Sequence, residues 1–350
     1  MNSPPARGGV PATAGGAVGA TGSDVTTPGL PRLEGASEAD SHPPLLEKEG
    51  RVAAPNSDRG LAVAALLAGA VAIGASALFV KVSETGPVAT AFWRVALALP
   101  LLWAWSTIEQ RGNHAASFAA DWRLLVVCGL FFAGDLAVWH WSIVLTSVAN
   151  ATLLANLAPI FVTLAVWALF RRKPAATFLG GLATALAGVA MLLGGDLHLG
   201  GQELLGDGLG VVTALFYGAY QLTVTALRAR VATSTIMAWS GLVTAAVLLP
   251  LALLSGEEML PHSMTGWVKL AGLALISQVA GQSLIAYAMA HLPATFSSVG
   301  LLLQPVMAAL FAWILLGEAL GPLEIAGGIV VLIGIRIAQR AELFSAARRD

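Results

Sequence analysis

Ten long apolar segments follow one another from about residue 60 onward, separated by short polar stretches. Each has roughly 20 residues, enough to cross a hydrocarbon core about 30 Å thick at about 1.5 Å per residue. They lie near residues 61–82, 87–107, 122–145, 148–170, 175–195, 206–227, 233–254, 267–290, 294–316 and 319–339. This pattern predicts an all-α membrane protein with ten transmembrane helices.

The second half of the chain repeats the first at an offset of 146 residues, without a gap. The matching pairs are Pro159 and Pro305, Trp167 and Trp313, Gly181 and Gly327, Gly188 and Gly334, and Trp93 and Trp239. Each repeat contains five apolar segments, and because five is odd the second must enter the membrane from the opposite side. We therefore expect two inverted five-helix repeats, at residues 61–195 and 206–339, as in secondary transporters.

Composition agrees with a chain that lies in lipid: 57% of residues are hydrophobic, 11% are charged and the mean hydropathy is +0.77. The first 58 residues are rich in Gly, Pro, Ala and Ser, so we expect a disordered tail without a signal peptide. The single cysteine, Cys128, excludes a disulfide framework and a cysteine metal cluster. The net charge of −1 gives no reason to expect a nucleic acid partner.

Lysine and arginine predict the orientation of the chain in the membrane. With a cytoplasmic N-terminus, fourteen of them fall on inner loops and span ends, and only Lys81 and Lys269 fall on the outer side. Positive charge collects on the cytoplasmic side of membrane proteins. We therefore expect a multi-pass protein of the cell membrane whose tails, 1–58 and 340–350, are both cytoplasmic.

Two stretches resemble the EamA-type members of the drug/metabolite transporter superfamily. The first is GLFFAGDLAVWHWSIVLTSVANATLLANLAPI, residues 129–160, with the segment that follows it to residue 195. The second is AYAMAHLPATFSSVGLLLQPVMAALFAWILLGEALGPLEIAGGIVVLIG, residues 286–334. The resemblance covers about residues 60–340 and implies a ten-helix transporter with cytoplasmic termini and no cofactor. It implies little about substrate, because members are similar to exporters of amino acids, metabolites, drugs or lipid-linked carriers.

Several individual residues also fit places in the family's sequence pattern. In the family a helix that ends near a proline is followed by a glutamate and a glycine-rich closing helix. The residues that fit these places are Pro305, Glu318, Gly327, Gly328 and Gly334. Lys81 after the first span and Arg94 in the second also resemble the family. The first repeat has Arg172 where the second has Glu318. Any role of this glutamate would therefore be played in the second repeat alone.

Two charged residues lie deep in the predicted spans, Arg94 in the second and Asp135 in the third. Charged groups at bilayer depth usually face the interior of a helix bundle because their insertion is costly. Both lie about 10 to 15 Å below the outer ends of their helices, at about 1.5 Å per residue. We therefore expect an ion pair. It is either structural, or Asp135 binds a proton or a cationic group while Arg94 receives an anionic one.

Neutral polar residues extend this predicted pathway into both repeats. Thr152, Asn156, Pro159 and Thr163 share one face of the fourth span. Threonine can bond to its own helix, and because Asn156 does so less easily it is the best neutral candidate for the site. Trp139 is one turn from Asp135, whereas His140 is rotated by about 140° and is a weaker candidate. The predicted substrate or ion pathway consists of Asp135, Arg94, Asn156, Trp139, Tyr217, Gln221, Gln278, Gln282 and Gln304.

A second set of residues is expected to be structural: Pro159, Pro305, Gly188 and Gly334. Gly180, Thr184 and Gly188 follow a four-residue spacing that suits close approach between helices. A homodimer contact through such residues is left open.

These observations predict an exporter of a small metabolite, amino acid or drug-like compound that works by alternating access, with proton coupling left open. The closest alternative is a flippase for a lipid or lipid-linked carrier with the same fold. An intramembrane enzyme would need a constellation such as H-E-x-x-H or G-x-S-x-G, and neither is present. A channel is disfavoured because there is no repeated filter-like loop and no ring of charges.

Overall fold

The computed structural model describes residues 56–112, 118–146, 148–171, 173–193, 203–317 and 319–347. Within these ranges the regular elements are all helical, and ten spans are long and apolar enough to cross a membrane. Both findings confirm the predicted fold class. Residues 1–55 of the predicted tail lie outside the described residues, as do Arg172 and Glu318. Residues 56–58, which we expected to belong to the tail, begin the first helix instead.

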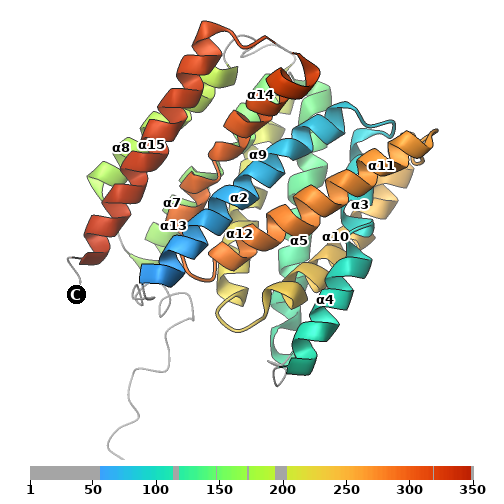
Figure 1. The fold of residues 1–350 in the computed structure, drawn as a ribbon, viewed down its shortest axis with the longest axis horizontal. Coiled ribbons are helices and arrows are strands. Elements are labelled where there is room, and N and C mark those ends of the chain that lie inside the picture. The colour runs from blue at the N-terminus through green and yellow to red at the C-terminus, as the bar shows by residue number, and fades with distance from the viewer. Residues whose placement is uncertain are drawn as a thin grey trace, which may run out of the picture. The chain divides into compact units, whose positions relative to one another are not determined.

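The spans follow the chain in order, and several consist of more than one helix (Figure 1). The first repeat contains α2 (Asn56–Lys81), α3 (Pro87–Ala96) with α4 (Leu99–Gly112), α5 (Phe118–Leu145), α6 (Val148–Ala155) with α7 (Ala158–Phe170), and α8 (Ala176–Leu193). The second contains α9 (Leu204–Leu227), α10 (Thr233–Leu254), α11 (Met264–Leu273) with the π-helix η4 (Ala274–Gln282) and α12 (Ser283–Ala288), α13 (Ala294–Gly300) with α14 (Leu303–Leu316), and α15 (Pro322–Ala347).

The fourth and ninth spans are broken at corresponding places, just before the two prolines that match between the repeats. Pro159 stands in the first turn of α7, and Pro305 follows the break between α13 and α14. Proline has no backbone N–H and its ring clashes with the preceding turn, so it kinks or breaks a regular helix. At both breaks a backbone hydrogen bond spans three residues instead of the four of an α-helix. These bonds run from Leu157 N to Leu154 O at 3.1 Å and from Leu302 N to Val299 O at 3.1 Å. Interrupted spans of this kind are typical of transporter midplanes.

The closing helices of the two repeats, α8 and α15, lie side by side at one edge of the bundle (Figure 1). A Cβ atom added to Gly188 would lie 2.4 Å from the backbone nitrogen of Val331, and one added to Gly334 would lie 2.3 Å from that of Ala185. No side chain fits at such distances, so these glycines let the two backbones touch. The repeats are therefore joined by contact within the chain, and a homodimer stays a prediction.

The glycine face of α8 differs from the expected one. Gly180 has no atom within 4 Å of an added Cβ, whereas a Cβ on Gly181 would lie 2.5 Å from the backbone nitrogen of Ala338. The packed face thus runs through Gly181, Ala185 and Gly188. The prediction that the packed face begins at Gly180 was wrong, because α8 turns the neighbouring line of residues toward α15.

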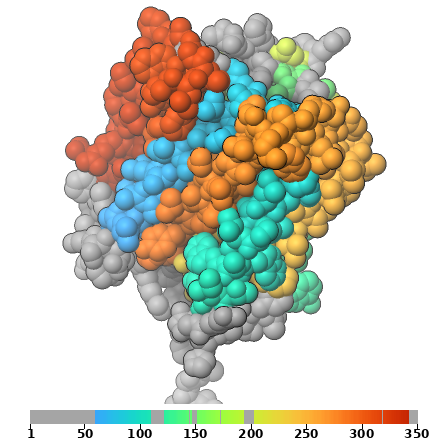
Figure 2. Space-filling view, turned by 45° about the vertical axis from the view of Figure 1, so that its right-hand side comes forward, coloured from blue at the N-terminus to red at the C-terminus, as the bar shows by residue number. Residues whose placement is uncertain are grey.

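On another side of the bundle, α2 packs against η4, α12 and α14. Figure 2 shows α2 in blue between the red C-terminal helices and the orange segment from α11 to α12. A Cβ on Gly69 would lie 2.9 Å from the Gly281 carbonyl oxygen, and one on Gly74 would lie 2.9 Å from that of Gln304. The first helix of the chain is therefore held tightly against the second repeat.

Two carboxylates connect the loop after α2 to the loop after α10. Glu257 accepts hydrogen bonds from the backbone nitrogens of Val88 at 2.9 Å and Ala89 at 3.2 Å, at the start of α3. Glu84 accepts from the backbone nitrogen of Ser263 at 3.1 Å and from its hydroxyl at 2.7 Å. Glu257 supplies acceptors for N–H groups that have no partner within α3, and its charge suits the positive end of that helix.

We expect the link through Glu84 to weaken in acid. The Ser263 hydroxyl, together with the Ser263 backbone and Lys269, holds the pKa of Glu84 below its usual value of 4.5. A carboxylate with a lowered pKa stabilises the folded state above its unfolded-state pKa, and this contribution disappears as the pH falls through the folded-state value. The melting temperature of the purified protein should therefore fall below about pH 4.5, and Glu84→Gln should show a smaller fall. An equal fall in both proteins would contradict this role.

Candidate functional site

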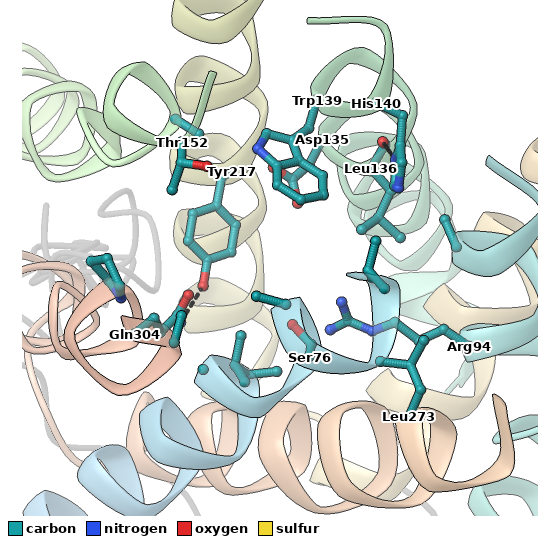
Figure 3. Close-up of a pocket in the computed structure, with 18 of the residues that line it drawn as sticks. Ser76, Arg94, Asp135, Leu136, Trp139, His140, Thr152, Tyr217, Leu273 and Gln304 are labelled. Carbon is teal, nitrogen blue, oxygen red and sulfur yellow. Dashed lines mark hydrogen bonds between the residues drawn. The ribbon is translucent and has the colours of Figure 1, made fainter. Parts of the chain in front are cut away.

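A cavity of about 180 Å³ lies between helices of both repeats. Its walls come from α2, α3, α5, the α6–α7 break, α9, α11, η4 and α14 (Figure 3). Its polar lining residues are Ser76, Thr90, Arg94, Asp135, Trp139, His140, Thr152, Asn156, Tyr217, Gln282 and Gln304. One water needs about 10–15 Å³ of cavity volume, so the cavity has room for several waters or for a solute of amino-acid size.

The cavity extends from the middle of the bundle toward the end that carries the loop between α2 and α3. Its walls use the last turns of α2 as far as Val80 and the first turns of α3 from Thr90. We call this the loop end, and we call the end where α2 begins and α15 finishes the terminal end. Toward the terminal end, Tyr220 stacks on Phe132 with ring centroids 4.7 Å apart and on Tyr217 at 6.3 Å. These three rings form the floor of the cavity.

Arg94 and Asp135 both reach the cavity but do not form the expected ion pair. The Nε of Arg94 donates to Oε1 of Gln278 at 3.2 Å, and its guanidinium carbon lies 5.9 Å from the centroid of the Phe132 ring. Asp135 has no hydrogen-bond or ion-pair partner among the described residues. Figure 3 shows the two side chains on different walls, one from α3 and one from α5. The expectation was wrong because similar depth does not fix distance, and here the cavity separates the two helices.

Most of the predicted pathway residues come together at this site. The seven that line the cavity are Arg94, Asp135, Trp139, Asn156, Tyr217, Gln282 and Gln304. Gln304 donates through Nε2 to the hydroxyl of Tyr217 at 3.2 Å, which connects α14 to α9. Gln278 lies behind Arg94 as its acceptor, and Gln221 is buried outside the cavity wall.

Asn156 differs from its expected role in one respect. Its Nδ2 donates to the carbonyl oxygen of Thr152 at 2.8 Å, one turn earlier in the same span. The helix break after Ala155 lets the side chain fold back onto α6, so Asn156 bonds within its own span, which we expected to be less easy for asparagine than for threonine. It still lines the cavity, beside Thr152.

His140 is a lining residue that sequence reasoning ranked too low. Its Nδ1 lies against the carbonyl oxygen of Leu136, and its Nε2 is buried with no partner among the described residues. A ring nitrogen that faces a carbonyl must carry the hydrogen, so neutral His140 would offer Nε2 as an acceptor. The cavity wraps around α5 from Phe132 to His140, which a single helical face does not reveal. The sequence signal that could have pointed to His140 is its position one helical turn after Leu136, whose carbonyl oxygen its ring nitrogen contacts.

Residues 60–194 and 204–339 each match the EamA-like transporter family. The chain belongs to this family. A protein from Archaeoglobus fulgidus named "Uncharacterized transporter" is 27% identical over 266 residues, which cover 74% of this chain and 91% of that protein. A "Probable terminal-alkyne amino-acid exporter" from Streptantibioticus cattleyicolor is 26% identical over 229 residues, which cover 64% of this chain and 75% of that protein.

The fold of this EamA-family chain is also found among solved structures. One crystal structure of a protein matches it with a TM-score of 0.70 at 17% identity, covering 82% of this chain and 99% of the other. At that identity the likeness concerns the fold alone. Together, the family match and the ten apolar spans make the chain a multi-pass membrane transporter of the EamA family.

Proposed function

We propose that the chain exports small zwitterionic compounds of amino-acid size by alternating access. Asp135 binds the substrate ammonium group and Arg94 binds its carboxylate. The observation that carries this proposal is a pair of opposite charges that line one cavity without pairing with each other. A buried charge is costly unless it is paired. A zwitterion supplies the missing partner to each residue at once.

The surroundings of each charge support this assignment. Because Gln278 holds Nε of Arg94, the other guanidinium nitrogens stay available for the bidentate contact that carboxylates prefer. Trp139, one turn from Asp135, presents an indole ring to the same cavity, and ammonium groups are attracted to such faces. The Tyr217–Gln304 pair lies on another wall and is positioned to meet the substrate side chain.

Direction, location and coupling complete the proposal. Both termini are cytoplasmic and the protein lies in the cell membrane, as the distribution of Lys and Arg indicates. The cavity then extends toward the outer face, the side on which an exporter releases its substrate. Once the ammonium group leaves, a proton on Asp135 is the simplest replacement, so export is coupled to proton entry. The name of the Streptantibioticus relative, an amino-acid exporter, supports both the direction and the substrate class.

Counterflow in liposomes tests the substrate class. Protein reconstituted with neutral L-amino acids inside should take up the same radiolabelled amino acids. It should exchange their N-acetylated and decarboxylated analogues at least about tenfold more slowly, because each analogue lacks one of the two charges. Equal exchange of all three forms would contradict the proposal. No exchange of any of them, with loss of a lipid-linked product in cells that lack the protein, would favour the lipid flippase instead.

A further inference from the structure

Several side chains at the cavity wall or just beyond its floor are buried with atoms that have no hydrogen-bond partner among the described residues. Both amide atoms of Gln221 and the hydroxyl of Ser297 find no partner among the described residues, and neither does Oε1 of Gln282. The three residues are 1%, 0% and 3% exposed. Folded proteins leave few such groups unpaired, and each one needs a physical explanation. We refer to Gln221, Gln282 and Ser297 as the inner polar group.

Helix register places the inner polar group on a line that continues the cavity toward the terminal end. The Tyr217–Gln304 hydrogen bond fixes the depth of α9 against α14, and α13 contacts α9. Gln221 follows Tyr217 by one turn on the same face, about 6 Å deeper. Ser297 precedes Gln304 by seven residues, about two turns or 10 Å, in the same direction. Gln282 lies at the cavity wall itself.

Neighbouring hydroxyl groups show that burial alone does not leave such groups unpaired. Ser298, next to Ser297 and equally buried, donates to the carbonyl oxygen of Thr295 at 2.9 Å. Thr225, one turn beyond Gln221, donates to the carbonyl oxygen of Gln221 at 2.9 Å. Gln221 and Ser297 are thus unpaired although the buried hydroxyl groups beside them have partners. Such groups find partners in a conformation where water or a ligand reaches them.

We propose that the inner polar group forms a second, weaker substrate site, which receives the zwitterion when the transporter opens at the terminal end. This inference rests on the proposed function for its ligand class. The amide oxygens of Gln221 and Gln282 accept hydrogen bonds from the ammonium group. Their amide N–H groups and the Ser297 hydroxyl donate to the carboxylate. Because the inner polar group contains no charged side chain, it holds the zwitterion less tightly than Arg94 and Asp135 do, and the substrate passes on to the cavity.

Cysteine labelling tests this site, because the chain has one cysteine to remove, the buried Cys128. Ser297→Cys and Ser298→Cys, each with Cys128→Ala, would be exposed to a membrane-impermeant cationic methanethiosulfonate in inside-out vesicles. The cysteine at position 297 should react from the terminal side, and millimolar neutral L-amino acids should slow the reaction. The matched variant at 298 should stay unreactive. Adding Gln221→Leu should slow labelling at 297 about tenfold, a change of roughly 1.4 kcal/mol in favour of the conformation described above. Thr225→Val should not slow it.

The outcomes separate this inference from the proposed function. No labelling at position 297 in a protein that still performs counterflow would overturn the second site. Equal labelling at 297 and 298, or labelling that amino acids do not slow, would overturn it as well. Failure of the proposed function is seen independently, as wild-type protein that exchanges no amino acid at all.

Discussion

Replacing Asp135 with asparagine should reduce export of a zwitterionic amino acid by about 100-fold or more while leaving the protein inserted and folded. Asparagine keeps the size and shape of the side chain but cannot carry its charge. Losing one partner of a buried, hydrogen-bonded charge pair costs on the order of 3 kcal/mol, which corresponds to a factor of about 100. The measurement is counterflow in liposomes at substrate concentrations far below saturation.

Proton coupling gives Asp135→Asn a second readout. Wild-type export should accelerate when the external side is acidic, and the residual export of the variant should not respond to the gradient. Asp121→Asn is the matched control, because Asp121 forms its 2.9 Å ion pair with Arg230 and does not line the cavity. Wild-type rates in Asp135→Asn, or a residual rate that still follows the pH gradient, would contradict the coupling role.

The spans and the repeat could be predicted from sequence because hydrocarbon imposes a length and a composition on every helix that crosses it. The same physics pointed to Arg94 and Asp135, because charges at bilayer depth face the bundle interior. The pairing of these residues could not be predicted. Depth follows from counting residues, whereas lateral position depends on packing. The π-helix η4 brings Gln278 to Arg94, and sequence spacing gave no sign of it.

The expectations for two individual residues, Asn156 and His140, differ from the structure for a related reason. The side chain of Asn156 bonds back to Thr152 because the helix breaks after Ala155, and the exact form of that break depends on neighbouring spans. His140 lines the cavity although it is turned away from Asp135, because the cavity surrounds much of α5. A helical wheel assumes one interior face, and a helix at the wall of a wide cavity has more than one.

The unequal distribution of charge between the repeats has a steric explanation. Gly281 occupies the position that corresponds to Asp135, and a Cβ there would lie 3.0 Å from Cδ1 of Ile73 and 3.3 Å from Cβ of Ala72. This point of η4 packs against α2, whereas Asp135 on α5 faces the cavity. An equivalent carboxylate in the second repeat would therefore have to displace Ile73, and both charged residues of the cavity wall come from the first repeat.

Replacing Arg94 with glutamine should change which compounds are transported rather than only slow transport. Export of the amino acid should fall about 100-fold, since its carboxylate loses a charged partner. The decarboxylated amine should be exchanged faster than the amino acid, because Asp135 remains as the single cavity charge of the variant. Arg94→Lys should lie between wild type and Arg94→Gln, with roughly a tenfold loss, because lysine keeps the charge but not the planar fork that binds a carboxylate with two hydrogen bonds.

Asp135→Asn provides the opposite case, since it leaves Arg94 as the single charge and should favour the N-acetylated acid over the free amino acid. Counterflow with the amino acid, its amine and its N-acetylated form, measured on both variants, compares these preferences directly. Elution of each variant as a single peak from gel filtration would control for misfolding. If both variants lost all three compounds to the same extent, Arg94 and Asp135 would be structural groups rather than the two ends of a zwitterion site. Opposite preferences in the two variants are expected only if each charge contacts its own end of the substrate.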